Sequence, residues 1–525
     1  MPTLLHYPEL QTVHATIAGH ARRQPEALAL ICGERQLSYQ ALHLASNRTA
    51  HALAAAGHGR GARVAYLGKE SERYYDLLFA CAKAECVLVP INWRLAAAEV
   101  DHILRDSATQ LLLVEREFMP VVEQVRAALP ALRQVIVLDD AGPEGFDAWS
   151  SAQGDAELVP TTGPEDAIAQ LYTSGTTGLP KGVVVAHRSF FRVRDALASQ
   201  QLDWIDWLPS DRSLVAVPGF HVGGLWWAIQ GFSAGITNVA MRMFVSSDAV
   251  ALIRRHGVTT MCAVPSMLQM MLAEHGVSAA DFASLRKVVY GGSPIAETLL
   301  QRGLEIMGCQ FAQIYGLTET GNTAVCLPPS EHVPGSPRMQ AAGRPYPGFR
   351  LKVIDKQGQP LPPREIGEVC IDTPSRMIEY WGLPEATAST LVDGWIHTGD
   401  AGYLDEEGFV FICDRIKDMI IVAGEKVYPA EIENALTKHP SVAECAVIGV
   451  PDPRWGETVM AFVALKAGAE ATPRELMKSL KGQIADFKIP TRFEFIARVP
   501  RNPSGKVLRR ELRDRQWQGM ARQVN

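Results

Sequence analysis

The sequence lacks the features that mark nucleic-acid-binding proteins and disulfide-rich or zinc-binding proteins. Lysine and arginine number 51 against 57 aspartates and glutamates, a formal charge of -6, so there is no basic excess to attract nucleic acid. The nine cysteines include no Cys-x-x-Cys pair, which favours neither a disulfide framework nor a zinc site. A reducing cytoplasm is the compartment that this cysteine usage fits.

Long apolar runs are also missing. Residues 1–10 show no basic segment followed by an apolar core, and no run approaches the roughly 18 apolar residues of a membrane-spanning helix. We therefore expect neither secretion nor insertion into a membrane. The chain does have length and apolar content: 525 residues, 47% hydrophobic and only 21% charged, can bury several cores in more than one domain.

The first third of the chain alternates between strand and helix patterns. Apolar runs at Arg63–Leu67 and Cys86–Ile91 flank a helical spacing at Glu72–Ala84, which predicts a βαβ unit and hence a parallel sheet. Before it, Ser38 is a suitable N-cap for a surface helix over Tyr39–Ala55. These patterns predict an α/β fold.

A second series of the same kind lies further along the chain. A helical spacing at Ala249–Arg255 precedes predicted strands at Thr259–Val264, Lys287–Tyr290 and Gln310–Ile314. Residues 141–164, rich in glycine, serine, aspartate and proline, separate the two series and are typical of a connecting loop.

Two of these strands end in residues suited to ligand binding. Gly291 and Gly292 follow one strand and Tyr315 follows the next, and in open parallel sheets the binding crevice lies beyond the carboxyl ends of the strands. Ser293 and Pro294 have the chemistry of an N-cap and a first helical residue, so we expect a helix to begin there.

The stretch from Leu171 to His187 is the strongest functional signal. It interleaves hydroxyl residues with glycines beside a lysine, so that several donors can point at one anion. The residues concerned are Thr173, Ser174, Gly175, Thr176, Thr177, Gly178 and Lys181. Pro180 and Gly182 flank Lys181, whereas a Walker A loop has glycine before its lysine and serine or threonine after it. The run is either a phosphate loop outside that class or an ordinary polar surface loop.

Five further motifs follow this loop. They are Gly291-Gly292-Ser293-Pro294, Tyr315-Gly316-Leu317-Thr318-Glu319, His397-Thr398-Gly399-Asp400, Asp414-Arg415-Ile416-Lys417-Asp418 and Asn502-Pro503-Ser504-Gly505-Lys506. With the loop, they resemble the adenylate-forming superfamily, which includes acyl-CoA synthetases, peptide-synthetase adenylation domains and luciferases. The resemblance spans nearly the whole chain, and Asp418–Glu433 with Pro451–Glu457 most resembles the fatty-acyl-CoA and aryl-CoA ligases.

The resemblance implies two domains. A large N-terminal domain, residues 1–416, would consist of parallel-sheet βαβ subdomains, and a small mobile α+β C-terminal domain, residues 417–525, would swing on a hinge at Lys417. The patterns beyond the hinge agree with a compact α+β unit. They predict strands at Ala443–Val450, Val459–Leu465 and Phe493–Ala497, and a helix at Pro473–Ala485.

The resemblance also implies roles in ATP binding. Tyr315 would stack on the adenine, Thr318 would contact a phosphate, and Glu319 would hold Mg²⁺. Asp400 would accept the ribose hydroxyls, and Arg415 would approach the ribose or phosphate. The rest of the implied ATP site comprises Thr173, Ser174, Gly175, Thr176, Thr177, Gly178, Lys181, Gly291, Gly292, Ser293, Gly316 and Lys506.

The implied catalytic residues serve different parts of the reaction. Thr173 belongs to the phosphate loop, and Lys506 resembles the lysine that neutralises charge while the carboxylate joins the α-phosphate. His221, within Pro218–Gly224, resembles a residue near the reacting carboxylate. The C-terminal domain would then present a second face to the thiol, with Gly424, Glu425 and Lys426, where Ala423 replaces a glycine common in the family.

The acyl pocket is the least defined part of the predicted site. Amino-acid-activating relatives typically carry aspartate near the position of His221, so an uncharged acyl tail is implied. Trp226, Trp227, Val264 and Met267 form either an apolar channel for that tail or ordinary core. Fatty and aryl acids both remain open.

The implied activity is an ATP-dependent acyl-CoA synthetase that uses Mg²⁺, forms an acyl-adenylate and passes the acyl group to coenzyme A, releasing AMP and pyrophosphate. The alternatives are an aryl-CoA ligase, a stand-alone enzyme that loads a carrier protein, and a catalytically dead nucleotide-binding protein. The partners expected are a small carboxylic acid, ATP and CoA, without nucleic acid. A homodimer stays open, as does peripheral membrane contact through the arginines between 509 and 522, which otherwise form a solvated basic tail.

Overall fold

Two sheets with parallel centres form most of the molecule. The computed structural model describes residues 4–173, 180–293, 295–422, 425–452, 456–501 and 507–517. The first sheet has seven strands in the order β18-β8-β7-β4-β3-β5-β6, of which β3 to β7 are parallel. Its strands are β3 (Arg63–Leu67), β4 (Val87–Ile91), β5 (Leu111–Val114), β6 (Gln134–Val137), β7 (Ala167–Thr173), β8 (Lys181–Ala186) and β18 (Glu379–Tyr380).

The second sheet has nine strands in the order β15-β14-β13-β12-β11-β9-β10-β1-β2, with a parallel stretch from β13 to β1. Its strands are β1 (Leu28–Cys32), β2 (Arg35–Ser38), β9 (Arg212–Val215), β10 (Thr237–Ala240), β11 (Thr260–Ala263), β12 (Lys287–Gly291), β13 (Gln310–Tyr315), β14 (Val325–Leu327) and β15 (Arg344–Pro345). The predicted α/β fold and its two βαβ series are confirmed.

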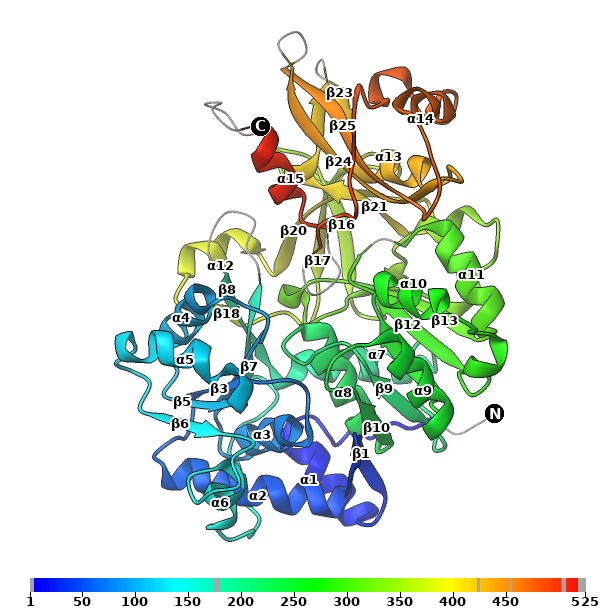
Figure 1. Cartoon of the computed structure of the whole chain (residues 1–525). Coiled ribbons are helices and arrows are strands. Elements are labelled where there is room, and N and C mark those ends of the chain that lie inside the picture. The colour runs from blue at the N-terminus through cyan, green and yellow to red at the C-terminus, as the bar shows by residue number, and fades with distance from the viewer. Residues whose placement is uncertain are drawn as a thin grey trace.

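Helices pack on both sheets (Figure 1), and one apolar core contains residues from the two sheets and from α1, α2, α3 and α8. The helices of this part are α1 (Val13–Arg23), α2 (Tyr39–Ala55), α3 (Glu72–Lys83), α4 (Ala97–Asp106), α5 (Met119–Val125), α6 (Phe146–Ser151), α7 (Arg192–Ser199), α8 (Val222–Ala234), α9 (Ser246–His256), α10 (Pro265–Ala273) and α11 (Glu297–Met307). Ser38 caps α2 as predicted, accepting a hydrogen bond from the Ala41 N–H. The helix is more deeply buried than a surface helix, because Tyr39, Leu42 and Leu53 are fully covered.

Two local predictions were wrong. The segment 141–164 is not all loop, since its buried Phe146 begins the short helix α6. Ser293 does not cap a helix: α11 begins only at Glu297, with Ala296 as its N-cap. Gly292 has a φ of +84°, so the chain makes a turn after β12 before it can enter the helix. Pro294 lies outside the described residues.

A third, antiparallel sheet was not predicted. It consists of β16 (Arg350–Ile354), β17 (Gly367–Asp372), β19 (Leu391–Val392), β20 (Trp395–Leu404) and β21 (Val410–Arg415), with α12 (Pro384–Thr390) beside it. The motifs containing Asp400 and Arg415 lie on its strands β20 and β21, so this sheet carries part of the predicted site.

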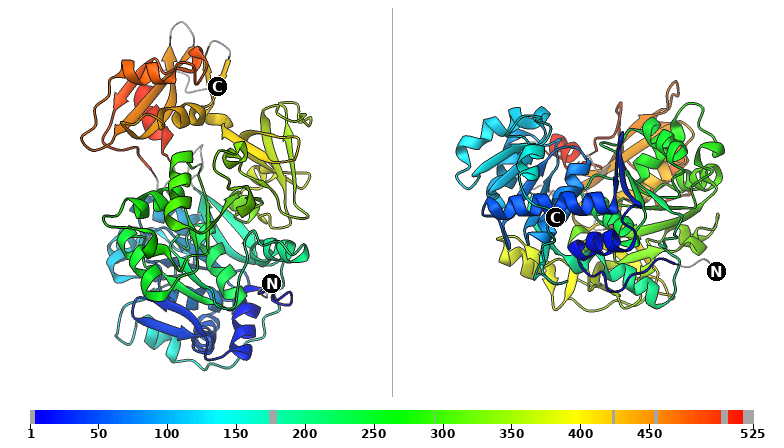
Figure 2. Two further views of the ribbon diagram at one scale, coloured as in Figure 1. Left: turned by 90° about the vertical axis from the view of Figure 1, so that its right-hand side faces the viewer. Right: turned by 90° about the horizontal axis from the view of Figure 1, so that it is seen from below.

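The C-terminal segment forms a smaller α+β unit with its own apolar core, at the end of the molecule opposite the first helices (Figures 1 and 2). Its elements are β22 (Ile420–Val422), β23 (Glu425–Val427), β24 (Val442–Asp452), β25 (Gly456–Leu465), β26 (Arg492–Phe495), α13 (Pro429–Leu436), α14 (Pro473–Leu480) and α15 (Arg509–Gln516). The predicted helix at 473–485 ends early, because Lys481 is extended and Gly482 has a φ of +79°.

The chain passes from the third sheet to the C-terminal sheet through a short 3-10 turn, Ile416–Asp418. The sequence predicts the domain boundary and the hinge at this point. No helix of the described residues is both long and apolar enough to cross a membrane.

Candidate active site

The predicted phosphate loop connects two paired strands. Thr173 ends β7 and Lys181 begins β8, and the two residues are partners in the antiparallel ladder. The turn between them contains Ser174, Gly175, Thr176, Thr177 and Gly178, which lie outside the described residues. The structure therefore fixes the two ends of the loop beside each other, at the carboxyl end of β7.

Asp400 joins three elements of the site. The Tyr315 hydroxyl, at the end of β13, donates to Asp400 Oδ2 over 2.7 Å, and Arg415 Nε of β21 lies 2.7 Å from Asp400 Oδ1. Burial, and then the neighbouring Asp400 charge, raise the pKa of Tyr315 well above its usual value, so the phenol stays a donor. Each carboxylate oxygen keeps a further lone pair that can accept a hydroxyl of a bound ribose.

A dense hydrogen-bond network holds the segment of β20 that carries Asp400. The Thr398 hydroxyl donates to the Val369 carbonyl over 2.7 Å and accepts from the Asp400 N–H over 3.0 Å. Gly399 has a φ of +67°, which glycine adopts without strain, and its N–H donates to Glu368 Oε1 over 3.0 Å. This segment of β20 is thus fixed by its partners on β17.

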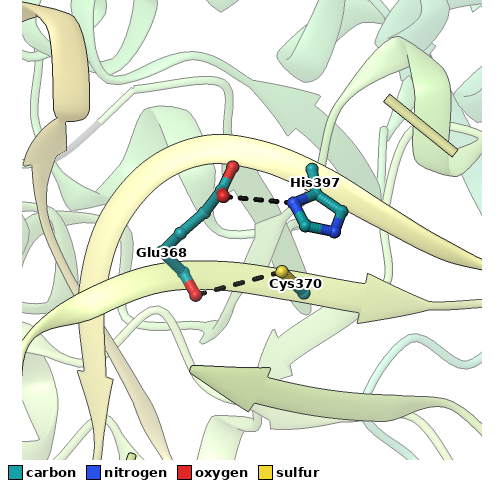
Figure 3. A group of neighbouring side chains, drawn as sticks. All are labelled: Glu368, Cys370 and His397. Carbon is teal, nitrogen blue, oxygen red and sulfur yellow. Dashed lines mark hydrogen bonds and ion pairs between the residues drawn. The ribbon is translucent and has the colours of Figure 1, made fainter. Parts of the chain in front are cut away.

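Glu368, Cys370 and His397 lie close enough together to suggest a metal site, with candidate ligand atoms within 4.8 Å of one another (Figure 3). Their bonding favours a structural role. Both Glu368 oxygens already have partners, the Gly399 N–H and His397 Nδ1 at 3.1 Å. Burial also raises the pKa of the Cys370 thiol to about 12, which keeps it protonated. We assign the cluster to support of the β20 segment that carries Asp400.

Glu319 and Lys181 are connected through a tyrosine that the sequence did not single out. The Tyr380 hydroxyl on β18 donates to Glu319 Oε1 over 2.6 Å, and Lys181 Nζ lies 4.9 Å from the centre of the Tyr380 ring. The Met377 N–H donates to the Glu319 carbonyl, which fixes the two segments together. No motif includes Tyr380; only the pairing of β18 with β8 brings it here.

The donor set around Glu319 fits Mg²⁺. Among the described residues no hydrogen bond reaches Glu319 Oε2, so one hard carboxylate oxygen is available for the ion. Thr318 precedes Glu319 in the same 3-10 turn, directly after the Tyr315-Gly316 segment. The predicted metal ligand and phosphate contact therefore lie side by side.

Glycines allow close backbone packing at the strand ends. A Cβ on Gly291 would lie 2.4 Å from the Ile314 carbonyl oxygen, and one on Gly316 would lie 2.4 Å from the Asn322 carbonyl oxygen. Both distances are too short for any side chain. The end of β12, at Gly291, therefore lies beside the end of β13. The residues that follow, Gly292 and Ser293, are next to the turn after β13, as expected for a shared crevice.

The segment around His221 is held in place by Tyr74 of α3 and by Glu70, which precedes this helix. The Tyr74 hydroxyl donates to the Gly219 carbonyl over 2.8 Å, and the Gly219 N–H donates to Glu70 Oε2 over 2.9 Å. A Cβ on Gly219 would lie 2.5 Å from the Tyr74 ring, so this position needs glycine. Glu70 is buried, accepts a second hydrogen bond from Tyr75, and burial raises its pKa to about 7.

His221 is the N-cap residue of α8, and among the described residues its buried Nε2 has no hydrogen-bond partner. Burial, and then the charge of Arg94, lower its pKa to about 4, so the imidazole is neutral near pH 7. Trp226 and Trp227 are at most 2% exposed and belong to the main core, and Trp227 donates to the Leu214 carbonyl. These two tryptophans are core residues rather than the wall of an open channel.

The remaining predicted residues lie in the C-terminal unit. Lys506 and Gly424 are outside the described residues, as is the side chain of Lys417, whose backbone lies in the Ile416–Asp418 turn. Glu425 and Lys426 are exposed on β23. The described part of the basic tail, α15, is not simply solvated: Arg509 and Arg513 form ion pairs with acidic residues of the C-terminal unit.

Comparison with known proteins agrees with this arrangement. Residues 17–381 match the family model of the AMP-binding enzymes, and residues 431–506 match that of the AMP-binding enzyme C-terminal domain. The chain therefore belongs to the AMP-binding enzymes of the adenylate-forming superfamily. It is an AMP-forming acid–thiol ligase, an enzyme that activates a carboxylic acid by adenylation and transfers the acyl group to a thiol.

Relatives with different acceptors are similar over almost the whole chain. A fatty acid–[acyl-carrier-protein] ligase, ScoC of Streptomyces coeruleorubidus, is 62% identical over 522 residues, covering 99% of each chain. A feruloyl-CoA synthase of an Amycolatopsis species is 38% identical over 498 residues, covering 94% of this chain and 97% of that one.

Solved structures of one relative, MatB from Rhodopseudomonas palustris, are available in two states. The ATP-bound form superposes with a TM-score of 0.89 at 29% identity, and the apo form with 0.79 at 28%; each comparison covers 98% of this chain and 100% of the other. The arrangement described here is thus closer to the ATP-bound form.

Proposed function

We propose that the chain is a fatty acid ligase that loads the thiol of an acyl-carrier protein, with CoA as the second candidate acceptor. The observation that carries the choice is the 62% identity, over 99% of both chains, to a ligase of that type. The motifs alone favour CoA, and so do relatives such as the feruloyl-CoA synthase, at 38% identity. Both acceptors present a thiol, so the adenylation site has the same task in either case.

In the first half-reaction, an oxygen of the substrate carboxylate attacks the α-phosphorus of ATP, and the bond to pyrophosphate breaks. Asp400 and Tyr315 position the nucleoside, while Lys181 and the donors of the 173–178 loop bind the phosphates. Mg²⁺ held by Glu319 would neutralise phosphate charge. Lys506, delivered by the C-terminal unit, would stabilise the charge that develops between the two anions.

In the second half-reaction, the thiol sulfur attacks the acyl carbonyl, loses its proton, and displaces AMP. The C-terminal unit would rotate about Lys417 to remove Lys506 and to bring Gly424, Glu425 and Lys426 towards the thiol. The neutral imidazole of His221, held in place through Gly219, would contact the reacting carboxylate end. The closer superposition on the ATP-bound relative supports the view that the present arrangement serves the first half-reaction.

Measurement of AMP release from ATP and Mg²⁺ tests the proposal. The acids are short-chain, medium-chain, long-chain and aryl acids. Each acid is combined with CoA, with holo acyl-carrier proteins, or with the same carriers in the apo form. We expect turnover with fatty acids to require the holo carrier and to yield an acylated carrier detectable by mass. The apo carrier is the control, because it lacks the thiol. Equal or better turnover with CoA would assign the CoA ligase instead, and no turnover with any acid would exclude both.

A further inference from the structure

An ionic network connects α15, the helix that follows the Lys506 motif, to both sides of the Ile416–Asp418 turn. Arg509 Nη2 lies 2.7 Å from Glu433 Oε2 of α13, and Arg509 Nη1 lies 3.8 Å from Asp414 Oδ1. The side chain of Arg509 is only 15% exposed. The guanidinium is thus held among carboxylates in a largely buried setting, where charge pairs are screened little by solvent.

Asp414 is the member of this network that belongs to the third sheet. It lies on β21, before the turn, yet its Oδ2 accepts a hydrogen bond of 2.9 Å from the Ala430 N–H in the first turn of α13. Its Oδ1 accepts from the Arg415 N–H over 2.8 Å. One buried carboxylate therefore caps a helix of the C-terminal unit and faces a cation of that unit.

The partners of Arg509 on the other side move with it. Glu433 lies on α13 and also accepts a hydrogen bond from the Val447 N–H of β24, so its contacts stay within the C-terminal unit. Arg513, on the next turn of α15, pairs with Asp418 over 2.9 Å, and Arg509 Nη1 lies 4.0 Å from the same carboxylate. Asp418 follows the proposed hinge at residue 417, so these pairs also lie within the C-terminal unit. In the described part of the chain, Asp414 is the one acidic partner of Arg509 and Arg513 that precedes the turn.

We propose that the Asp414–Arg509 pair is a latch that holds the C-terminal unit in its adenylation orientation. The inference rests on the proposed function of Lys506 and Lys417. α15 begins two residues after Val507, which pairs with Arg501 in a backbone bridge, so anchoring α15 to β21 also anchors this bridge. Rotation about Lys417 would separate Asp414 from Arg509 and leave a buried charge without its partner, which opposes the movement.

The test compares two identical chemical changes on either side of the turn. Asp414→Asn keeps the size of the side chain and an acceptor for a backbone N–H but removes the charge opposite Arg509. Glu433→Gln makes the same change to a partner of Arg509 that lies within the C-terminal unit. Pyrophosphate exchange reports the first half-reaction, and thioester formation from added acyl-adenylate reports the second.

We expect Asp414→Asn to slow pyrophosphate exchange about tenfold relative to thioester formation, and Glu433→Gln to leave the ratio of the two rates unchanged. An unchanged ratio in Asp414→Asn, or the same selective loss in both variants, would overturn the latch. If Asp414→Asn does not fold, Arg509→Lys replaces it, because a single ammonium group cannot contact Glu433 and Asp414 with the geometry of the guanidinium fork. Wild-type enzyme without exchange activity would refute the proposed function itself, whereas an active wild type with unselective variants would refute only the latch.

Discussion

At the centre of the site, the Tyr380 side chain connects the carboxylate proposed for Mg²⁺ to the lysine of the phosphate loop. Tyr380→Phe removes the hydrogen bond to Glu319 but keeps the ring beneath Lys181. Hydrogen bonds to charged groups contribute about 1.5–3 kcal/mol, so we expect the affinity for Mg²⁺–ATP to fall at least about tenfold. Calorimetric titration with Mg²⁺–ATP measures it, independently of turnover.

A second tyrosine provides the control for this change. Tyr403 lies on β20 of the third sheet, where its ring stacks on Phe411 with 4.9 Å between the centroids. Tyr403→Phe removes a hydroxyl of the same kind without touching Glu319, and we expect its Mg²⁺–ATP titration to match that of the wild type. If Tyr380→Phe also matched the wild type, Tyr380 would have no part in holding Glu319.

The buried carboxyl of Glu70 gives a prediction about pH. Its pKa in the folded state is about 7, above the ordinary value of 4.5, because burial disfavours the charged form. The folded state therefore binds this proton more tightly than the unfolded state, and the wild type loses up to about 3 kcal/mol of stability as the pH rises from 4.5 to 7. Glu70→Gln mimics the protonated form and does not lose this stability. The melting temperature of Glu70→Gln minus that of the wild type should therefore increase from pH 5 to pH 8.

An exposed glutamate separates this effect from a general effect of charge. Glu123 lies on the outer face of α5. Glu123→Gln changes the net charge by the same amount as Glu70→Gln, but we expect its melting temperature to follow that of the wild type at both pH values. A parallel shift in both variants would mean that the Glu70 carboxyl is not responsible.

Among the elements, the Ile416–Asp418 turn is the one on which the proposed domain movement depends. Proline at 417 would fix φ near -65° and restrict the preceding residue, so Lys417→Pro should impair mainly the second half-reaction. Thioester formation from supplied acyl-adenylate and pyrophosphate exchange together measure the split. Lys417→Ala is the control, because it removes the side chain and leaves the backbone free; unchanged thiol-dependent turnover in Lys417→Pro would remove the hinge assignment.

The elements also show what could be read from the sequence. Strands β3, β4, β12 and β13 and helix α2 were predicted nearly to the residue, because buried parallel strands are short apolar runs and α2 has a clear N-cap. The third sheet was not predicted, because the sequence features identified in this region are the motifs that contain Asp400 and Arg415 and not strand patterns. Asp400 and Arg415 could be singled out individually, but their pairing depends on the ladder between β20 and β21.

Tertiary structure accounts for the residues of the candidate site that the sequence did not reveal. Tyr380 reaches Glu319 because β18 pairs with β8, far away in the chain, and Glu70 and Tyr74 reach Gly219 across the core. None of these residues has a composition or spacing that marks it locally. A buried carboxylate or tyrosine is recognised as part of a site only when its partners are known.

At the scale of the whole molecule, the proposed mechanism gives one active site two alternative partners from the C-terminal unit, one for each half-reaction. If Lys506 acts only when that unit is in its adenylation orientation, Lys506→Ala should abolish adenylation and spare thioester formation from supplied acyl-adenylate. Lys426→Ala, on β23 of the opposite predicted face, should retain pyrophosphate exchange. The reason is that each lysine would reach the acyl group in only one orientation of the same unit.

Combining Lys506→Ala with the latch variant Asp414→Asn distinguishes a C-terminal unit that rotates from one that stays fixed. With Lys506 removed, Asp414→Asn has no adenylation left to impair, so its only remaining effect would be to ease rotation towards the thiol-bound orientation. We therefore expect the double variant to form thioester from supplied acyl-adenylate at least as fast as Lys506→Ala alone. A slower double variant would contradict the latch and show that the Asp414 charge supports the second half-reaction as well, because Asp414→Asn keeps an acceptor for the Ala430 N–H and removes only the charge opposite Arg509.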